Sequence, residues 1–155
     1  MWEVAPRVAL GATEGMVTLN IARNSQSSSV LGMLPAHVAA APMSRYDGQE
    51  QVRLARLDKV GEVALTSCRS PLLKIDTQGY EREVLRGADG VMPMINGLQL
   101  ELSVVPLYEG QGELHEMLAY VKTLGFACHA LFPGFIDHHS GRLLQMDGIF
   151  IREAT

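Results

Sequence analysis

The sequence has no cluster of lysine and arginine, no long apolar run and only two cysteines. With a net charge of −4 and no basic patch, the chain is not expected to bind nucleic acid. No segment approaches the roughly 20 apolar residues that a membrane span requires. Residues 1–4 do not form the basic start of a signal peptide. These absences predict a cytoplasmic protein without a nucleic-acid partner or a membrane span.

Side chains that could hold a metal or form a nucleophilic triad are also scarce. Cys68 and Cys128 match no metal-binding spacing, so we expect two reduced thiols in the core. Residues 137–139 (Asp-His-His) and Asp147 invite a metal interpretation, but adjacent histidines point to different sides of an extended chain. We therefore expect a solvated loop there and no metal site. No Ser-His-Asp or Cys-His arrangement can be assembled from local context.

The length of 155 residues fits one domain with a real core, and two regions differ in their patterning. Residues 1–60 are predicted to hold a hairpin and a variable loop segment, and residues 70–155 a strand-helix-strand core. In the first region, residues 7–10 and 16–21 read as two strands around the turn 11–15. The alternation of residues 16–21 favours a half-buried hairpin.

The rest of the first region has weaker patterns. Residues 24–29 are polar and are predicted to be flexible. Residues 35–48 are predicted to form a loop, because alanine, proline and glycine break any period. Val52, Leu54 and Leu57 then predict a strand that ends at Asp58.

From Leu72 onward the order becomes strand, helix, strand, helix, strand, strand, which is typical of an α/β fold. The first helix would bury Tyr80, Val84, Leu85 and Ala88 on one face. The following strands are predicted at residues 98–102, 128–132 and 148–151. The second helix carries an i, i+3, i+4, i+7 stripe and stops at Gly125. That stripe consists of Leu114, Met117, Leu118, Val121 and Leu124.

Residues 72–81 (LLKIDTQGYE) form the most informative segment, a buried strand followed by a carboxylate, a glycine turn and a helix. Ligands of open α/β sheets lie outside the carboxyl ends of the strands, where Asp76 stands. Asp76 could orient or deprotonate a reacting group, or Asp76 or Thr77 could cap the helix. Glu81 belongs to the same pocket, or it is a first-turn acid that the helix dipole favours. Glu101, on an otherwise apolar strand, lies at the pocket or pairs with Lys74.

These segments resemble the FkbM family of methyltransferases, which use S-adenosylmethionine. The resemblance covers nearly the whole chain, and the combination of its motifs is specific. In the second half the motifs are residues 74–81, 84–88, 98–103, 106–110, 125–126, 133–135 and 145–150. In the first half they are residues 9–11, Gly15, Asn24, 27–29 and 57–58.

The resemblance implies a Rossmann-like class I methyltransferase sheet, truncated at the N-terminus, which is a mixed parallel sheet with an antiparallel last strand. It implies methyl transfer from S-adenosylmethionine to a hydroxyl of a sugar or natural product, a small-molecule acceptor. The resemblance implies that Asp76 and Glu101 are catalytic residues. It also implies that Asp76, Gln78 and Gly79 bind the cofactor and that Glu81 and Ser103 bind the acceptor.

The front of the chain departs from the family pattern. Family members begin with a strand, a glycine-rich turn and a second strand that ends in an acid, and about 60 residues at ~30 per strand–helix unit are expected to be missing here. The turn 11–15 is no substitute, because it leads into a strand and not into a helix. We therefore expect the chain alone to bind S-adenosylmethionine weakly or not at all.

The same departure predicts an unpaired edge beside the strand at 72–76, which favours a homodimer or a partner chain that supplies the missing elements.

Two other functions stay open. A truncated relative without catalysis would serve as an interaction or binding module, and a test of S-adenosylmethionine binding would distinguish it from the enzyme. A different Rossmann-type enzyme that binds a nucleotide would need the same glycine turn.

Overall fold

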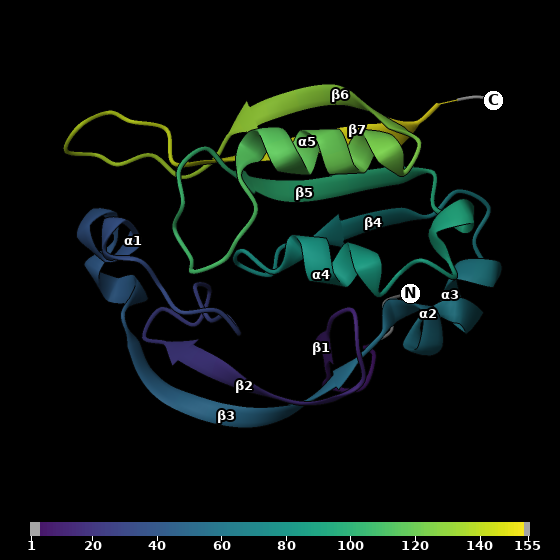
Figure 1. Ribbon diagram of the computed structural model, residues 1–155, viewed down its shortest axis with the longest axis horizontal. Helices are drawn as coiled ribbons and strands as arrows, with labels where there is room; N and C mark the ends of the chain where they lie inside the picture. Colours follow the sequence, from purple (N-terminus) through teal and green to yellow (C-terminus); the bar gives the residue numbers. More distant parts are fainter. Residues whose placement is uncertain (1–3, 154–155) are drawn as a thin grey trace.

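The chain folds into two β-sheets with short helices around them, as the computed structural model describes for residues 4–153 (Figure 1). The predicted α/β class with mixed strand directions is confirmed. In chain order, the elements are β1 (Ala9–Leu10), β2 (Gly15–Ala22), α1 (Pro35–Ala40), the 3-10 turn η1 (Pro42–Ser44), β3 (Tyr46–Ala55), α2 (Leu57–Val60), α3 (Glu62–Thr66), β4 (Leu72–Ile75), α4 (Glu81–Arg86), the 3-10 turn η2 (Met92–Met94), β5 (Gly97–Ser103), α5 (Leu114–Thr123), β6 (Phe126–Pro133) and β7 (Gln145–Arg152).

The larger sheet has the strand order β4-β5-β7-β6. β4 and β5 are parallel, and β7 runs antiparallel to both β5 and β6, so the predicted antiparallel last strand is confirmed. Helices α4 and α5 lie along this sheet (Figure 1). Alternate residues of β5, namely Leu98, Leu100 and Leu102, are fully buried in one cluster with Phe150 of β7 and side chains of both helices. The core therefore lies between this sheet and the two helices.

The two helices form where the apolar periodicity predicts them. Val84 and Leu85 of α4 and Met117 and Val121 of α5 are buried in the core. The α5 helix begins with a capping box, in which the side chains of Glu113 and Glu116 each accept a backbone N–H of the first turn. It ends at the predicted place, with a glycine at φ +84° in position 125.

The smaller sheet corrects the predicted hairpin. Its order is β1-β3-β2, so β1 and β2 do not pair with each other. β3 lies between them, parallel to β1 (Ala9 beside Leu54) and antiparallel to β2 (Val17 beside Val52). Alternation in residues 16–21 identified a strand correctly, but a strand pattern carries no information about a partner that lies thirty residues away.

Other predictions for the first third also fail. Residues 35–48 contain α1 and η1 and the start of β3, and not a single loop. The strand predicted to end at Asp58 ends at Ala55, because residue 57 already begins α2. Residues 24–29 form a turn in which Asn24 Oδ1 accepts the Ser27 N–H at 3.1 Å, and their predicted flexibility stays a prediction. The backbone of these segments is determined by hydrogen bonds to distant strands and by short local turns. Neither leaves a periodic hydrophobic pattern in the sequence.

Cys68 and Cys128 are free thiols as predicted, but both are exposed, so their placement in the core was wrong. Cys68 follows the short helix α3, and Cys128 lies on β6, the outer strand of the larger sheet. Among the described residues, no helix is long and apolar enough to cross a membrane.

The two sheets meet where the end of α4 touches the turn after β1. A Cβ atom at Gly87 would collide with the carbonyl oxygen of Gly11. The Gly87 carbonyl also accepts the N–H of Asp58, at 3.0 Å. Only a residue without a side chain lets α4 approach this closely, so the glycine of the Leu85-Arg86-Gly87-Ala88 motif is a packing requirement.

We predict that Gly87→Ala lowers the free energy of unfolding by about 1–3 kcal/mol, because backbone must move to admit the methyl group. Urea denaturation of the purified chain measures the loss. Gly48→Ala is the matched control, since the nearest atom to its Cβ would be Ile21 Cβ at 3.7 Å, an ordinary contact. Equal stability of the Gly87→Ala and wild-type chains would show that the approach of α4 to the β1 turn is not tight.

Candidate active site at the carboxyl ends of β4 and β5

A tight left-handed turn connects β4 to α4. Gln78 and Gly79 have φ values of +56° and +97°, and together they reverse the chain after Thr77. The Glu81 carboxylate closes the turn, because its Oε1 accepts the N–H groups of Thr77 (3.0 Å) and Gly79 (3.1 Å) and the Thr77 hydroxyl (3.2 Å). Glu81 is 6% exposed, and burial raises the pKa of its carboxyl group. This oxygen of Glu81 thus faces the backbone of the turn.

Asp76 leaves the turn on the open side, with 44% of its side chain exposed. Its Oδ2 lies 3.1 Å from Lys74 Nζ, and its Oδ1 accepts the Gln78 Nε2–H group at 2.9 Å. The carboxylate raises the pKa of Lys74. Neither Asp76 nor Thr77 caps α4, because the N-cap position is Tyr80 and it has no side-chain cap. The structure therefore removes the helix-cap interpretation of Asp76.

Glu101 lies beside Asp76 on the neighbouring strand, since Ile75 pairs with Leu100 in the parallel register of β4 and β5. Its Oε2 accepts two amide N–H groups, from Gln78 at 3.0 Å and from Gln145 at 2.6 Å. Lys74 pairs with Asp76 and not with Glu101, so the predicted alternative of a Lys74–Glu101 pair is not found.

The surroundings of Glu101 disfavour its charged form. Burial is the largest cause, and the carboxylates of Asp76, Glu81 and Asp147 add repulsion, which together raise the pKa of Glu101 to about 7. The hydrogen bond from Gln145 acts in the opposite direction. A carboxyl group with such a pKa exchanges a proton near neutral pH, as a general base or acid must.

Ser103 completes the polar end of β5. It is buried, and its Oγ lies 3.5 Å from Gln145 Nε2. The structure therefore brings Asp76, Gln78, Glu101 and Ser103 into one hydrogen-bonded group.

Sequence reasoning assigned no role to three residues that support this group: Ser29, Tyr108 and Gln145. Ser29 Oγ donates to the Gln78 carbonyl oxygen at 2.8 Å, and the Tyr108 hydroxyl donates to Gln78 Oε1 at 2.7 Å. Each lies in a motif of the resemblance, and that was the only sign of their importance in the sequence.

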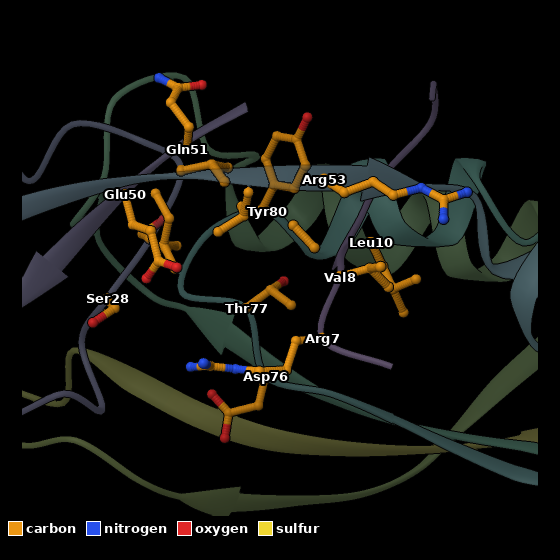
Figure 2. Close-up of a pocket in the computed structure, with 15 residues that line it drawn as sticks. Arg7, Val8, Leu10, Ser28, Glu50, Gln51, Arg53, Asp76, Thr77 and Tyr80 are labelled. Carbon is orange, nitrogen blue, oxygen red and sulfur yellow. The ribbon is translucent and has the colours of Figure 1, made fainter. Parts of the chain in front are cut away.

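A cavity of about 600 Å³ opens beside Asp76, between β4 and the smaller sheet (Figure 2). Asp76, Thr77 and Tyr80 line it from one side, and residues of β1, β2, β3 and the adjoining segments line it from the other. Its wall is mixed, with apolar side chains such as Leu19 and Val52 and charged ones such as Arg7 and Glu50. This volume falls in the range of small-molecule sites.

The Asp-His-His segment is occupied by local contacts. Asp137 accepts the N–H of His139 at 3.0 Å and the hydroxyl of Ser140. Within residues 4–153, no group of three or more histidine, cysteine or acidic side chains is arranged to hold a metal ion.

The family model for the methyltransferase FkbM domain matches residues 2–128 of the chain. The matched span contains β4, α4 and β5, and so it includes Asp76, Gln78, Glu101 and Tyr108. No curated protein and no solved structure matches the chain significantly.

The raised pKa of Glu101 makes the stability of the chain depend on pH. Its folded pKa of about 7 lies above the ordinary value of 4.5, so the stabilisation from protonated Glu101 is complete below pH 4.5 and is lost as the pH rises through 7. We predict that the unfolding free energy of the wild type, relative to Glu101→Gln, falls by up to about 3 kcal/mol between pH 4.5 and 8.

Urea titrations across this pH range measure the difference. Glu62→Gln, at an exposed position on α3, controls for the loss of one carboxylate elsewhere on the chain. A constant difference between the wild type and Glu101→Gln at every pH would contradict the environment assigned to Glu101.

Proposed function

The chain belongs to the FkbM methyltransferase family, and from this we propose that it takes part in methyl transfer from S-adenosylmethionine to a hydroxyl of a sugar or natural product. The observation that carries the proposal is the pair Asp76 and Glu101, which one amide holds at the carboxyl ends of two parallel strands, with Asp76 lining a cavity. This is the position at which open α/β sheets bind ligands.

The residues around the cavity fit the chemistry of S-adenosylmethionine, which supplies a methyl group on a positively charged sulfur. Asp76 offers a carboxylate to the ammonium or hydroxyl groups of such a ligand, and Leu19 and Val52 offer apolar surface to a flat base. Gln78 and Gly79, which we also assign to the cofactor side, form the turn that presents Asp76. We assign two residues to the acceptor side: Ser103, at the end of β5, and Glu81, inside the turn.

In this proposal Glu101 is the general base. Its Oε2 is held by two amide groups, and among the described residues no hydrogen bond occupies its Oε1. A bound S-adenosylmethionine would supply the methyl group, and Glu101 would accept the proton that the acceptor hydroxyl releases when its oxygen is methylated. Asp76, paired with Lys74, lies on the open side of the turn, where it can face the positive charge of the ligand. Placing the groups in line supplies most of the remaining rate gain.

The exposed edge of β4 favours a second property, association with another chain. Among residues 4–153, β4 pairs only with β5, so its other side presents unpaired N–H and C=O groups. Leu72, 57% exposed, lies beside Gly97, which pairs on its other side with the exposed Ile151. We propose that this edge and its apolar row form the interface of a homodimer, with a different partner chain as the alternative.

We predict that Asp76→Asn lowers methyl transfer about 100-fold, the scale on which single catalytic groups act, while stability changes by less than about 1 kcal/mol. Transfer of a labelled methyl group from S-adenosylmethionine to a panel of hydroxyl acceptors measures the loss, in the assembled form of the chain. Asp47→Asn, in an exposed ion pair with Arg23, is the matched control. Full transfer by Asp76→Asn would exclude Asp76 from the chemistry.

For the association, we predict that the wild-type chain sediments as a dimer at micromolar concentration and that Leu72→Lys shifts it to monomer, because a charge on an edge strand opposes pairing. Val63→Lys introduces the same charge at an 84% exposed position on α3 and should leave the dimer intact. A wild-type monomer, or a dimer equally weakened by both variants, would contradict the homodimer through β4.

A further inference from the structure

All polar atoms of the Gln78 side chain are engaged within the protein. Oε1 accepts the Tyr108 hydroxyl at 2.7 Å, and Nε2 donates one hydrogen to Asp76 Oδ1 at 2.9 Å and the other to Glu101 Oε2 at 3.0 Å. An amide NH₂ group has two hydrogens, so each carboxylate receives one. The side chain is only 9% exposed. One buried amide thus joins the two carboxylates of the site.

The backbone of Gln78 is held in an unfavourable conformation for this purpose. A φ of +56° is unfavourable for a non-glycine residue, so neighbouring contacts must maintain it. The buried Ser29 supplies one such contact through its hydroxyl, which donates to the Gln78 carbonyl oxygen. The left-handed backbone directs the Gln78 side chain back over the sheet, toward the end of β5.

Tyr108 determines which end of the amide faces the carboxylates. Its ring is 1% exposed and contacts the edge of the His37 ring, with centroids 5.1 Å apart. Its backbone N–H is held by Gln111 Oε1 at 2.6 Å. Because the hydroxyl of this fixed ring donates to Gln78 Oε1, the NH₂ group must point at Asp76 and Glu101. A reversed amide would place its oxygen against both carboxylates.

We propose that Gln78 is the positioning residue of this site: its amide, oriented by Tyr108, holds Asp76 and Glu101 at a fixed separation and leaves Glu101 Oε1 free. The consequence for catalysis rests on the proposed function, but the clamp itself does not. Two neighbouring carboxylates repel each other, and shared N–H donors offset that repulsion while keeping both groups in place.

The clamp makes a prediction about Glu101 that does not require catalysis. Asp76, Glu81 and Asp147 surround Glu101 with negative charge, Lys74 is the nearby cation, and Gln78 and Gln145 are its neutral donors. Removing the Gln78 donor withdraws a hydrogen bond from the charged form. The pKa of Glu101 should then rise further, by about one pH unit for one hydrogen bond to a charged group.

The test is a ¹³C NMR titration of side-chain carboxyl groups in the full chain, with the Glu101 signal assigned from Glu101→Gln. Gln78→Asn is the main variant, because asparagine tolerates the left-handed backbone but its amide is one methylene too short to bridge. Tyr108→Phe is the second variant, since it removes only the orienting hydroxyl, and we expect a smaller rise in the same direction. Gln49→Asn and Tyr120→Phe are the controls, because Gln49 donates to Asn20 Oδ1 and the Tyr120 ring lies under the Arg82 guanidinium.

A raised pKa of Glu101 in both variants, with unchanged controls, supports the clamp, because a residue that only stabilised the fold would leave the carboxyl titration unchanged. An unchanged pKa of Glu101 in either folded variant overturns it. Methyl transfer distinguishes the two proposals. In an active chain, Gln78→Asn should shift the lower limb of the pH–rate profile upward by the same amount. A raised pKa in a chain that transfers no methyl group contradicts the proposed function and leaves the clamp standing.

Discussion

The buried carboxylate of Glu81 is the constraint on which the site depends. A carboxylate removed from water is unfavourable unless hydrogen-bond donors surround it, and here the donors are backbone groups of Thr77 and Gly79. Those groups converge on one oxygen only when the chain makes its left-handed turn at Gln78 and Gly79. Once formed, this turn determines the directions in which the side chains of Asp76 and Gln78 leave the backbone. A residue at the start of a helix therefore determines the shape of the loop before it.

The surroundings of the two neighbouring carboxylates, Asp76 and Glu101, differ. Asp76 is partly exposed, and its Oδ2 lies 3.1 Å from Lys74 Nζ. Glu101 is more buried, its hydrogen-bond donors within residues 4–153 are two amides, and three other carboxylates lie near it, so its pKa lies near neutrality. A carboxyl group whose pKa lies near neutrality is typical of acid–base sites. The side-chain amides of Gln78 and Gln145 allow Glu101 to be buried. Their neutral N–H groups stabilise its carboxylate, but they add no positive charge that would hold it ionised.

The first third of the chain carries no candidate catalytic group, yet it supports the site in two ways. It supplies the wall of the cavity opposite Asp76, through β2 and β3. It also anchors the turn after β4, because the Ser29 hydroxyl holds the Gln78 carbonyl, while Gly11 packs against Gly87 at the end of α4. The smaller sheet is thus a support for the loop that bears Asp76, although the two sheets share no strand.

The sequence by itself determined the elements from β4 to β7 and the position of Asp76. Apolar residues recur there at helical spacing (Val84 with Leu85, Met117 with Val121) or alternate in strands, and such periods depend only on which side chains avoid water. For Glu101 it left two alternatives open, a position at the pocket and an ion pair with Lys74. It did not determine the pairing of β1, β2 and β3, because strand partners far apart in sequence leave no local pattern. Only the tertiary structure decided that Glu81 turns inward, that Lys74 pairs with Asp76, and that Ser29, Tyr108 and Gln145 hold the site. Hydrogen bonds between residues tens of positions apart follow from how the chain folds back on itself, and no spacing in the sequence encodes them.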